Sequence, residues 1–143
     1  MKKFIILLPV ILTLLVCLAF SVKKQPVEQP INKSINLSIY RENNYSSAAY
    51  DSTIASIHVT VYKVVDNKCT PVCDKLFSGM QLKQFPEMQN ALNHSITIPN
   101  IMNSKEKLLI YYDVIYNTRG SELTLSNYMY TNAVKKDNLK INI

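Results

Sequence analysis

Cysteines are the residues of this 143-residue chain most suited to covalent chemistry, and two of them lie close together. Cys69 and Cys73 enclose three residues in the stretch CTPVC. In an oxidising compartment such a pair usually forms a disulfide. A zinc site would need further nearby ligands, and His58 and His94 both lie in separate expected strands. We therefore expect a structural disulfide between Cys69 and Cys73, with two reduced thiols as the alternative.

Cys17, the third cysteine, lies inside an N-terminal segment that resembles an export signal. Residues 1–21 contain a Met-Lys-Lys start, an apolar run and then the small residues Ala19 and Ser21. Cleavage before Cys17 would free a thiol for lipid attachment, which Leu14 favours and the bulky Val16 disfavours. Cleavage after Ser21 would release a secreted protein, and no cleavage would leave an inner-membrane anchor. All three alternatives place the rest of the chain outside the cytoplasm.

The residues of acid–base and nucleophilic catalysis show no recognisable arrangement elsewhere in the sequence. The chain has two histidines, two glycines and no GxSxG stretch, which argues against a nucleophile elbow or a glycine-rich phosphate loop. Its basic residues are scattered and do not alternate with aromatic residues, although the net charge is +6. We therefore expect a non-enzymatic protein with no cofactor, no metal site and no nucleic-acid partner.

Strands dominate the rest of the expected organisation. Residues 22–33, with two prolines and several charges, predict a flexible linker. Apolar and polar residues then alternate with the period of a strand. The expected strands lie at 34–40, 57–65, 94–98, 108–116, 122–131 and 138–143. Polar turns separate them, and residues 74–93, where the alternation is lost, predict a crossover with one or two helical turns. Residues 34–143 are therefore expected to form a two-sheet, all-β sandwich.

Tyrosine is the main aromatic residue, with nine copies and no tryptophan. Tyr128 and Tyr130 fall on the same face of one expected strand. Tyrosine suits half-covered strand faces because its ring is broad and largely apolar. We therefore expect these two rings to pack within the sandwich, with an aromatic binding patch as the alternative.

Two stretches resemble the type VI secretion outer-membrane lipoprotein family. Residues 35–67 contain an asparagine-bearing loop followed by a V-x-V-Y element, and residues 108–122, LLIYYDVIYNTRGSE, resemble a strand that ends in a tyrosine and an arginine before a turn. The matching residues are Asn43, Asn44, Val59, Val61, Tyr62, Tyr116 and Arg119. The resemblance implies a transthyretin-like sandwich, with an immunoglobulin-like sandwich as the related all-β alternative. It also implies lipid attachment at Cys17.

In that family the domain acts as a scaffold. The resemblance therefore implies a non-enzymatic, exported envelope protein of the periplasm, attached to the outer membrane and docking a periplasmic protein partner of a secretion apparatus. The turn composition of the loops near Cys69–Cys73 and 117–122 makes them candidates for the contact, with Asn117, Arg119 and Glu122 as the partner-binding residues. The alternative function is an exported binding module, adhesin-like or inhibitor-like, for a protein or sugar ligand.

Overall fold

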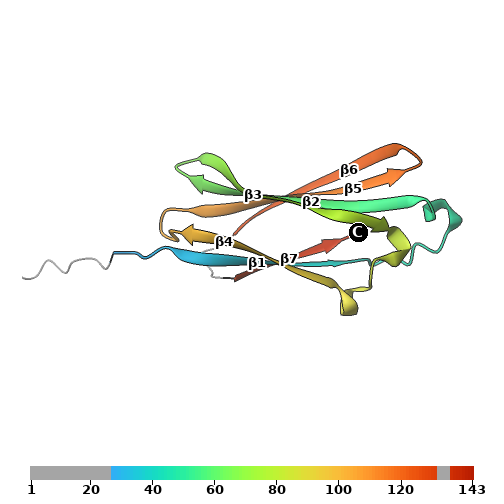
Figure 1. Ribbon diagram of the computed structural model, residues 1–143, viewed down its shortest axis with the longest axis horizontal. Helices are drawn as coiled ribbons and strands as arrows, with labels where there is room; N and C mark the ends of the chain where they lie inside the picture. The colour runs from blue at the N-terminus through green and yellow to red at the C-terminus, as the bar shows by residue number, and fades with distance from the viewer. Residues whose placement is uncertain (1–26, 132–135) are drawn as a thin grey trace, which may run out of the picture.

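The computed structural model describes residues 27–131 and 136–143, which form seven strands and three short 3-10 turns (Figure 1). The strands are β1 (Ile31–Tyr40), β2 (Thr53–Val65), β3 (Lys68–Gln81), β4 (Leu92–Ile101), β5 (Lys107–Thr118), β6 (Ser121–Tyr130) and β7 (Lys136–Asn142). The 3-10 turns are η1 (Ala48–Tyr50), η2 (Leu82–Gln84) and η3 (Met88–Asn90). Cys17 and the signal segment lie outside the described residues, so the predictions made for them remain untested.

The strands form two facing sheets, which confirms the all-β, two-sheet prediction. One sheet has the order β4-β1-β7 and the other the order β3-β2-β5-β6. All neighbouring strands are antiparallel except β1 and β7, which run parallel. An immunoglobulin constant domain instead places its first, second, fourth and fifth strands in one sheet. The strand order here is therefore different from that of an immunoglobulin domain.

Apolar side chains from both sheets meet between them and form one core. The strand-period alternation of the sequence is confirmed, because the residues it places inward are the ones that are buried. The core is built mainly from Ile35, Leu37, Ile39, Ile57, Val59, Val61, Ile96, Ile98, Leu108, Ile110, Val114, Leu139 and Ile141. Each such side chain contributes on the order of 1.5–3 kcal/mol when it is fully removed from water.

The geometry of β3 shows that the predicted disulfide between Cys69 and Cys73 is wrong. Val61 pairs with Cys73 and Tyr62 pairs with Pro71, so the residue between them is an extra one and forms a bulge. The bulge turns the two cysteines to opposite faces: Cys69 is exposed, and Cys73 packs against the core. Four residue steps along the strand also separate their Cα atoms by roughly 13 Å, about twice the span of a disulfide. Both thiols are free, which is the alternative that the sequence left open for this pair.

The helical turns predicted within residues 74–93 are also wrong for the first part of that range, because residues 74–81 continue β3. Leu76 pairs with His58 and Phe77 pairs with Ile57, so β2 supplies the hydrogen bonds that a helix would otherwise make. The crossover contains no helix beyond the 3-10 turns η2 and η3 in the part of the chain that the structure describes.

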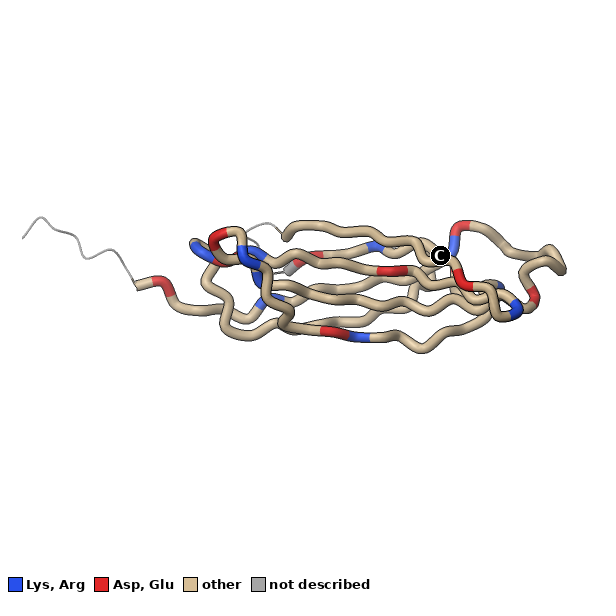
Figure 2. Tube along the Cα trace, turned by 90° about the horizontal axis from the view of Figure 1, so that it is seen from above, with Lys and Arg blue, Asp and Glu red and all other residues tan. Residues whose placement is uncertain are grey.

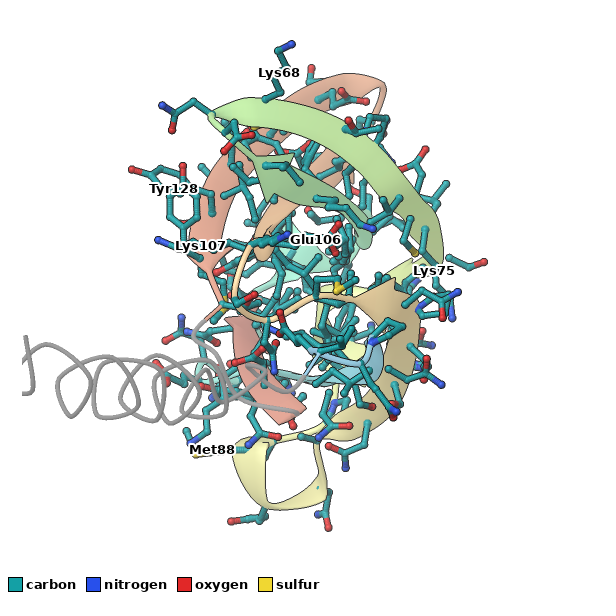
Figure 3. The ribbon with its side chains drawn as sticks, turned by 90° about the vertical axis from the view of Figure 1, so that its left-hand side faces the viewer. Lys68, Lys75, Met88, Glu106, Lys107 and Tyr128 are labelled. Carbon is teal, nitrogen blue, oxygen red and sulfur yellow. The ribbon has the colours of Figure 1, made fainter. Side chains whose placement is uncertain are left out.

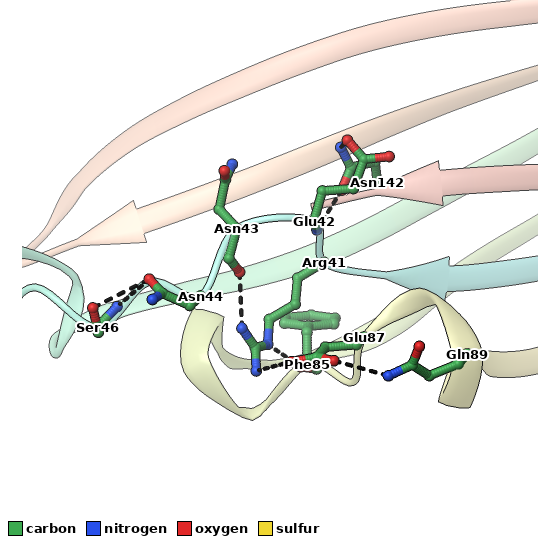
Figure 4. A network of polar contacts seen from close by, with 9 residues as sticks. All are labelled: Arg41, Glu42, Asn43, Asn44, Ser46, Phe85, Glu87, Gln89 and Asn142. Atoms are coloured by element: carbon green, nitrogen blue, oxygen red, sulfur yellow. Dashed lines mark hydrogen bonds and ion pairs between the residues drawn. The ribbon is translucent and has the colours of Figure 1, made fainter.

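Arg41 fixes this crossover to the end of β1 (Figure 4). Its backbone N–H donates to Pro86 O at 2.9 Å, and its Nε donates to Phe85 O at 2.6 Å. Its guanidinium also lies 3.7 Å from the carboxylate of Glu87 and donates to Asn43 O at 2.9 Å. Together these contacts hold η2 and η3 beside the loop that follows β1.

The sandwich is elongated, and its acidic and basic residues gather mostly at its two ends (Figure 2). Strand β1 begins at Ile31, three residues before the expected strand start at residue 34. Among residues 27–131 and 136–143, no helix is long and apolar enough to cross a membrane.

Candidate functional site

The three predicted partner-binding residues lie together on the hairpin between β5 and β6. Asn117 pairs directly with Glu122 across the hairpin, and Arg119 occupies the turn between them. Arg119 and Gly120 have φ angles of 51° and 85°, as a type I′ hairpin turn requires. The side-chain oxygen of Asn117 accepts a hydrogen bond from Gly120 N at 3.4 Å. The sequence therefore identified one compact structural unit, and its role in binding stays a prediction.

The other candidate loop, near Cys69–Cys73, lies at the opposite end of the same sheet. Thr53 of β2 pairs with Thr118 beside the β5–β6 hairpin, whereas Val64 pairs with Lys107 at the far end, next to the β2–β3 hairpin. The structure therefore does not bring the two predicted loops together. A single small partner surface cannot use both.

An apolar groove of about 390 Å³ lies beside the β5–β6 hairpin. We call it the hairpin groove, and it is lined by Tyr45, Tyr50, Thr53, Leu82, Tyr116, Thr118, Ser121, Glu122, Leu123 and Leu125. Glu122 belongs to both the predicted set and the lining. Four parts of the chain build it: the loop after β1, the start of β2 and the end of β5, the turn η2, and the first half of β6.

Leu123 and Leu125 form the most unusual wall of the groove. Tyr116 pairs with Leu123 and Val114 pairs with Leu125, so both leucines lie on the inner face of the four-stranded sheet. Their side chains are nevertheless 58% and 48% exposed. The facing sheet has three strands among the described residues, whereas this sheet has four, with β6 at its edge. Two leucines that would be core residues in a complete sandwich therefore face solvent.

Tyrosines form the other wall. The Tyr45 hydroxyl donates to Ile143 O at 2.5 Å, which joins this wall to the chain just past β7. The Tyr45 and Tyr50 rings pack edge to face with centroids 5.2 Å apart. Burial raises the pKa of the Tyr116 phenol above its ordinary value, and the nearby Tyr45 raises it further. Tyr116 therefore remains a neutral hydrogen-bond donor at neutral pH.

The outer face of the four-stranded sheet corrects the expectation for two other tyrosines. Tyr128 and Tyr130 are 69% and 56% exposed, with ring centroids 6.3 Å apart, so neither packs inside the sandwich. Tyr128 projects from the outer side of β6 (Figure 3). The packing expectation is wrong because these residues alternate with Met129, which takes the inward position.

Two hydrogen-bonded pairs lie on the same outer face. His58 Nε2 is 2.5 Å from Asp74 Oδ1, and Ser126 Oγ donates to Asp113 Oδ1 at 2.5 Å. A nucleophilic serine would instead need a hydrogen bond to a histidine that can take its proton. Residues 27–131 and 136–143 contain no group of three or more His, Cys, Asp or Glu side chains that could hold a metal ion.

A polar cavity of about 460 Å³ lies at the other end of the sandwich and is lined in part by Lys33, Asn103 and Glu106. Glu106 lies 3.3 Å from Lys63 and also accepts a hydrogen bond from Met102 N. Burial raises the pKa of Asp137, whereas the positive charge of Lys33 lowers it. Each of these two carboxylates therefore lies near a lysine, whereas Asp137 Oδ2 is buried without a hydrogen-bond partner.

Sequence reasoning found the β5–β6 hairpin but missed the groove. Leu123 and Leu125 show the expected alternation, and nothing in that alternation reveals that no strand covers them.

Comparison of the chain with protein-family models, curated protein sequences and solved structures found no match.

Proposed function

We propose that this chain is a non-enzymatic docking protein of the cell envelope that binds a protein partner through the hairpin groove. The observation that carries the proposal is the pair of exposed leucines on the inner face of β6, beside the hairpin that contains Asn117, Arg119 and Glu122. Apolar side chains left open beside polar residues are typical of protein–protein contact surfaces. The polar hairpin would form the rim and the leucines the centre of the contact.

The proposal includes export and attachment to the outer membrane through a lipid on Cys17, as part of a secretion apparatus. The family resemblance and the export-signal pattern support it, and a two-sheet sandwich whose strand order differs from an immunoglobulin domain is compatible with it. Intact mass of the membrane-extracted protein should show a cysteine carrying acyl chains. The Cys17→Ser variant should move to the soluble fraction if the lipid holds the protein.

Quantitative co-purification tests the groove. The tagged full-length chain is recovered from the envelope of the organism that carries the gene, and the co-purifying proteins are quantified. Leu125→Asp should reduce the partner's recovery about tenfold or more, because it places an unpaired charge in the contact. Leu76→Asp is the matched control, since Leu76 is an exposed strand leucine on β3 outside the groove. Equal loss with both variants, or no loss with Leu125→Asp, would contradict the proposal.

One observation favours the alternative function, a binding module for a protein or sugar ligand. Tyr128 and Tyr130 form an exposed aromatic surface on β6, with Ser126 on the same strand and Asp113 on the adjoining β5. Aromatic faces beside hydroxyl and carboxylate groups suit ligands that have both apolar and polar sides. If ligand capture is lost with Tyr128→Ala and unaffected by Leu125→Asp, this alternative replaces the groove.

A further inference from the structure

Strand β7 leaves one edge of the smaller sheet open beside the hairpin groove. It pairs only with β1 within the described residues, so the backbone groups along its other side have no strand partner there. The next position in that sheet would lie opposite β6. It is therefore the position from which an added strand would cover Leu123 and Leu125.

The two sides of the sandwich differ in how their edges are protected. On the side of β3 and β4, both edge strands contain a proline and at least one bulge, with Pro71 in β3 and Pro99 in β4. The Phe77 and His94 rings, 4.7 Å apart, show that these two strands face each other. Prolines and bulges are the usual means of preventing strand addition.

On the side of β6 and β7, those protections are missing. Neither strand contains a proline, and their pairings with β5 and β1 run without a register shift. In the end-on view of Figure 3, Tyr128 on β6 lies at one side and Lys75 on β3 at the other. The side without prolines or register shifts is also the side where the inner leucines are exposed.

We propose that a partner protein docks by adding an extended segment of its own to the free edge of β7, over the inner face of β6. This inference rests on the proposed docking function and names the form in which the partner binds. Main-chain hydrogen bonds to β7 would give affinity, and alternate side chains would give specificity. The inward side chains of the segment would be apolar and would cover Leu123 and Leu125.

The exposed side of β7 indicates the charge of the segment. Leu139 and Ile141 point inward, whereas Asn138, Lys140 and Asn142 are exposed. A segment with a carboxylate beside Lys140 would gain a cross-strand ion pair. A second copy of this chain would bring a second Lys140 toward the same edge, where like charges oppose pairing. An acidic, alternating segment of a different protein is therefore the occupant that fits.

The test uses the full chain in detergent and a synthetic peptide of about eight residues that alternates valine with threonine and glutamate. A scrambled peptide of the same composition is the control. Hydrogen exchange should show slower exchange of the β7 amides with the alternating peptide and no change with the scrambled one. Leu125→Asp should weaken binding about tenfold, and Leu76→Asp should leave it unchanged.

A charge exchange tests the register of the contact. Lys140→Glu should weaken binding of the glutamate peptide and strengthen binding of a peptide that carries lysine in its place. The proposal is overturned if neither peptide binds at millimolar concentration, if the scrambled peptide binds equally, or if protection appears elsewhere. Concentration-dependent protection of β7 without peptide would overturn it in favour of a second copy.

The outcomes separate this inference from the proposed function. If partner recovery depends on Leu125 but the bound partner leaves β7 exchange unchanged, docking at the groove stands and strand addition fails. If partner recovery is independent of Leu125, the proposed docking at the groove fails.

Discussion

Replacing Lys33 with methionine should destabilise the sandwich and make its stability depend more strongly on pH. Lys33 is 1% exposed and Asp137 is 9% exposed, and both lie on inward positions of neighbouring strands. Removing one partner of a buried charge pair typically costs about 3–5 kcal/mol, because the other charge stays buried without compensation. That is a large fraction of the about 5–15 kcal/mol that stabilises a typical domain.

The sign of the pH effect follows from the pKa of Asp137. Burial raises this pKa, and Lys33 opposes that rise, so removing Lys33 raises it further. A carboxyl group whose pKa is raised by folding holds its proton more tightly in the folded state. It therefore favours folding at acid pH, and that contribution is lost as the pH rises through the folded-state pKa. Lys33→Met should be closer to wild type at about pH 4 than at about pH 8.

Urea unfolding followed by far-ultraviolet circular dichroism measures both effects, since the chain has no tryptophan for fluorescence. The double variant Lys33→Met/Asp137→Asn should regain much of the lost stability, because no buried charge remains. A loss below about 1 kcal/mol at about pH 8, or equal losses at both pH values, would refute the interpretation of this pair.

Three further predictions test the backbone of β3, the β5–β6 turn and the two cysteines of β3. Gly79→Ala should cost about 1–3 kcal/mol in urea unfolding, because its Cβ would lie 2.6 Å from the Cγ2 of Ile54. Gly120 has open space around it, so Gly120→Ala should cost about 1 kcal/mol through its φ of +85° alone. Equal costs for the Gly79 and Gly120 variants would contradict the bulge assigned to β3. Thiol labelling of the native protein should modify Cys69 rapidly and Cys73 slowly, and failure to label either thiol without reductant would show the disulfide that the structure lacks.

Much of the fold was predictable because the alternation of apolar and polar residues along a strand indicates directly which side chains are buried. Ile35, Leu37 and Ile39 occupy every second position of β1, and all three are buried as that pattern predicts. Strand β3 was not predictable in the same way. Its two bulges break the alternation, so the stretch after Cys73 lost the period of a strand and suggested helical turns. The bulge between Pro71 and Cys73 places the two cysteines on opposite faces of the strand. The spacing of the cysteines along the chain does not reveal this bulge.

Only the part of the candidate site that is formed by residues close together in the sequence was predictable. The turn residues at 117–122 indicated a hairpin from composition alone, and Arg119 and Gly120 adopt the angles that it requires. The groove depends on how many strands each sheet contains, which is a property of the whole fold. Leu123 and Leu125 have the pattern of core residues, and their exposure on the edge strand β6 follows only from the folded arrangement of the two sheets.

Photo-crosslinking inside the cell tests the central claim most directly. A benzoylphenylalanine residue is placed at position 125 in the hairpin groove and, in a separate variant, at position 76 on β3. Docking at the groove predicts an adduct with one envelope protein from position 125, its identification as a secretion-apparatus component, and no such adduct from position 76. No adduct from position 125, or the same adducts from both positions, would contradict the claim.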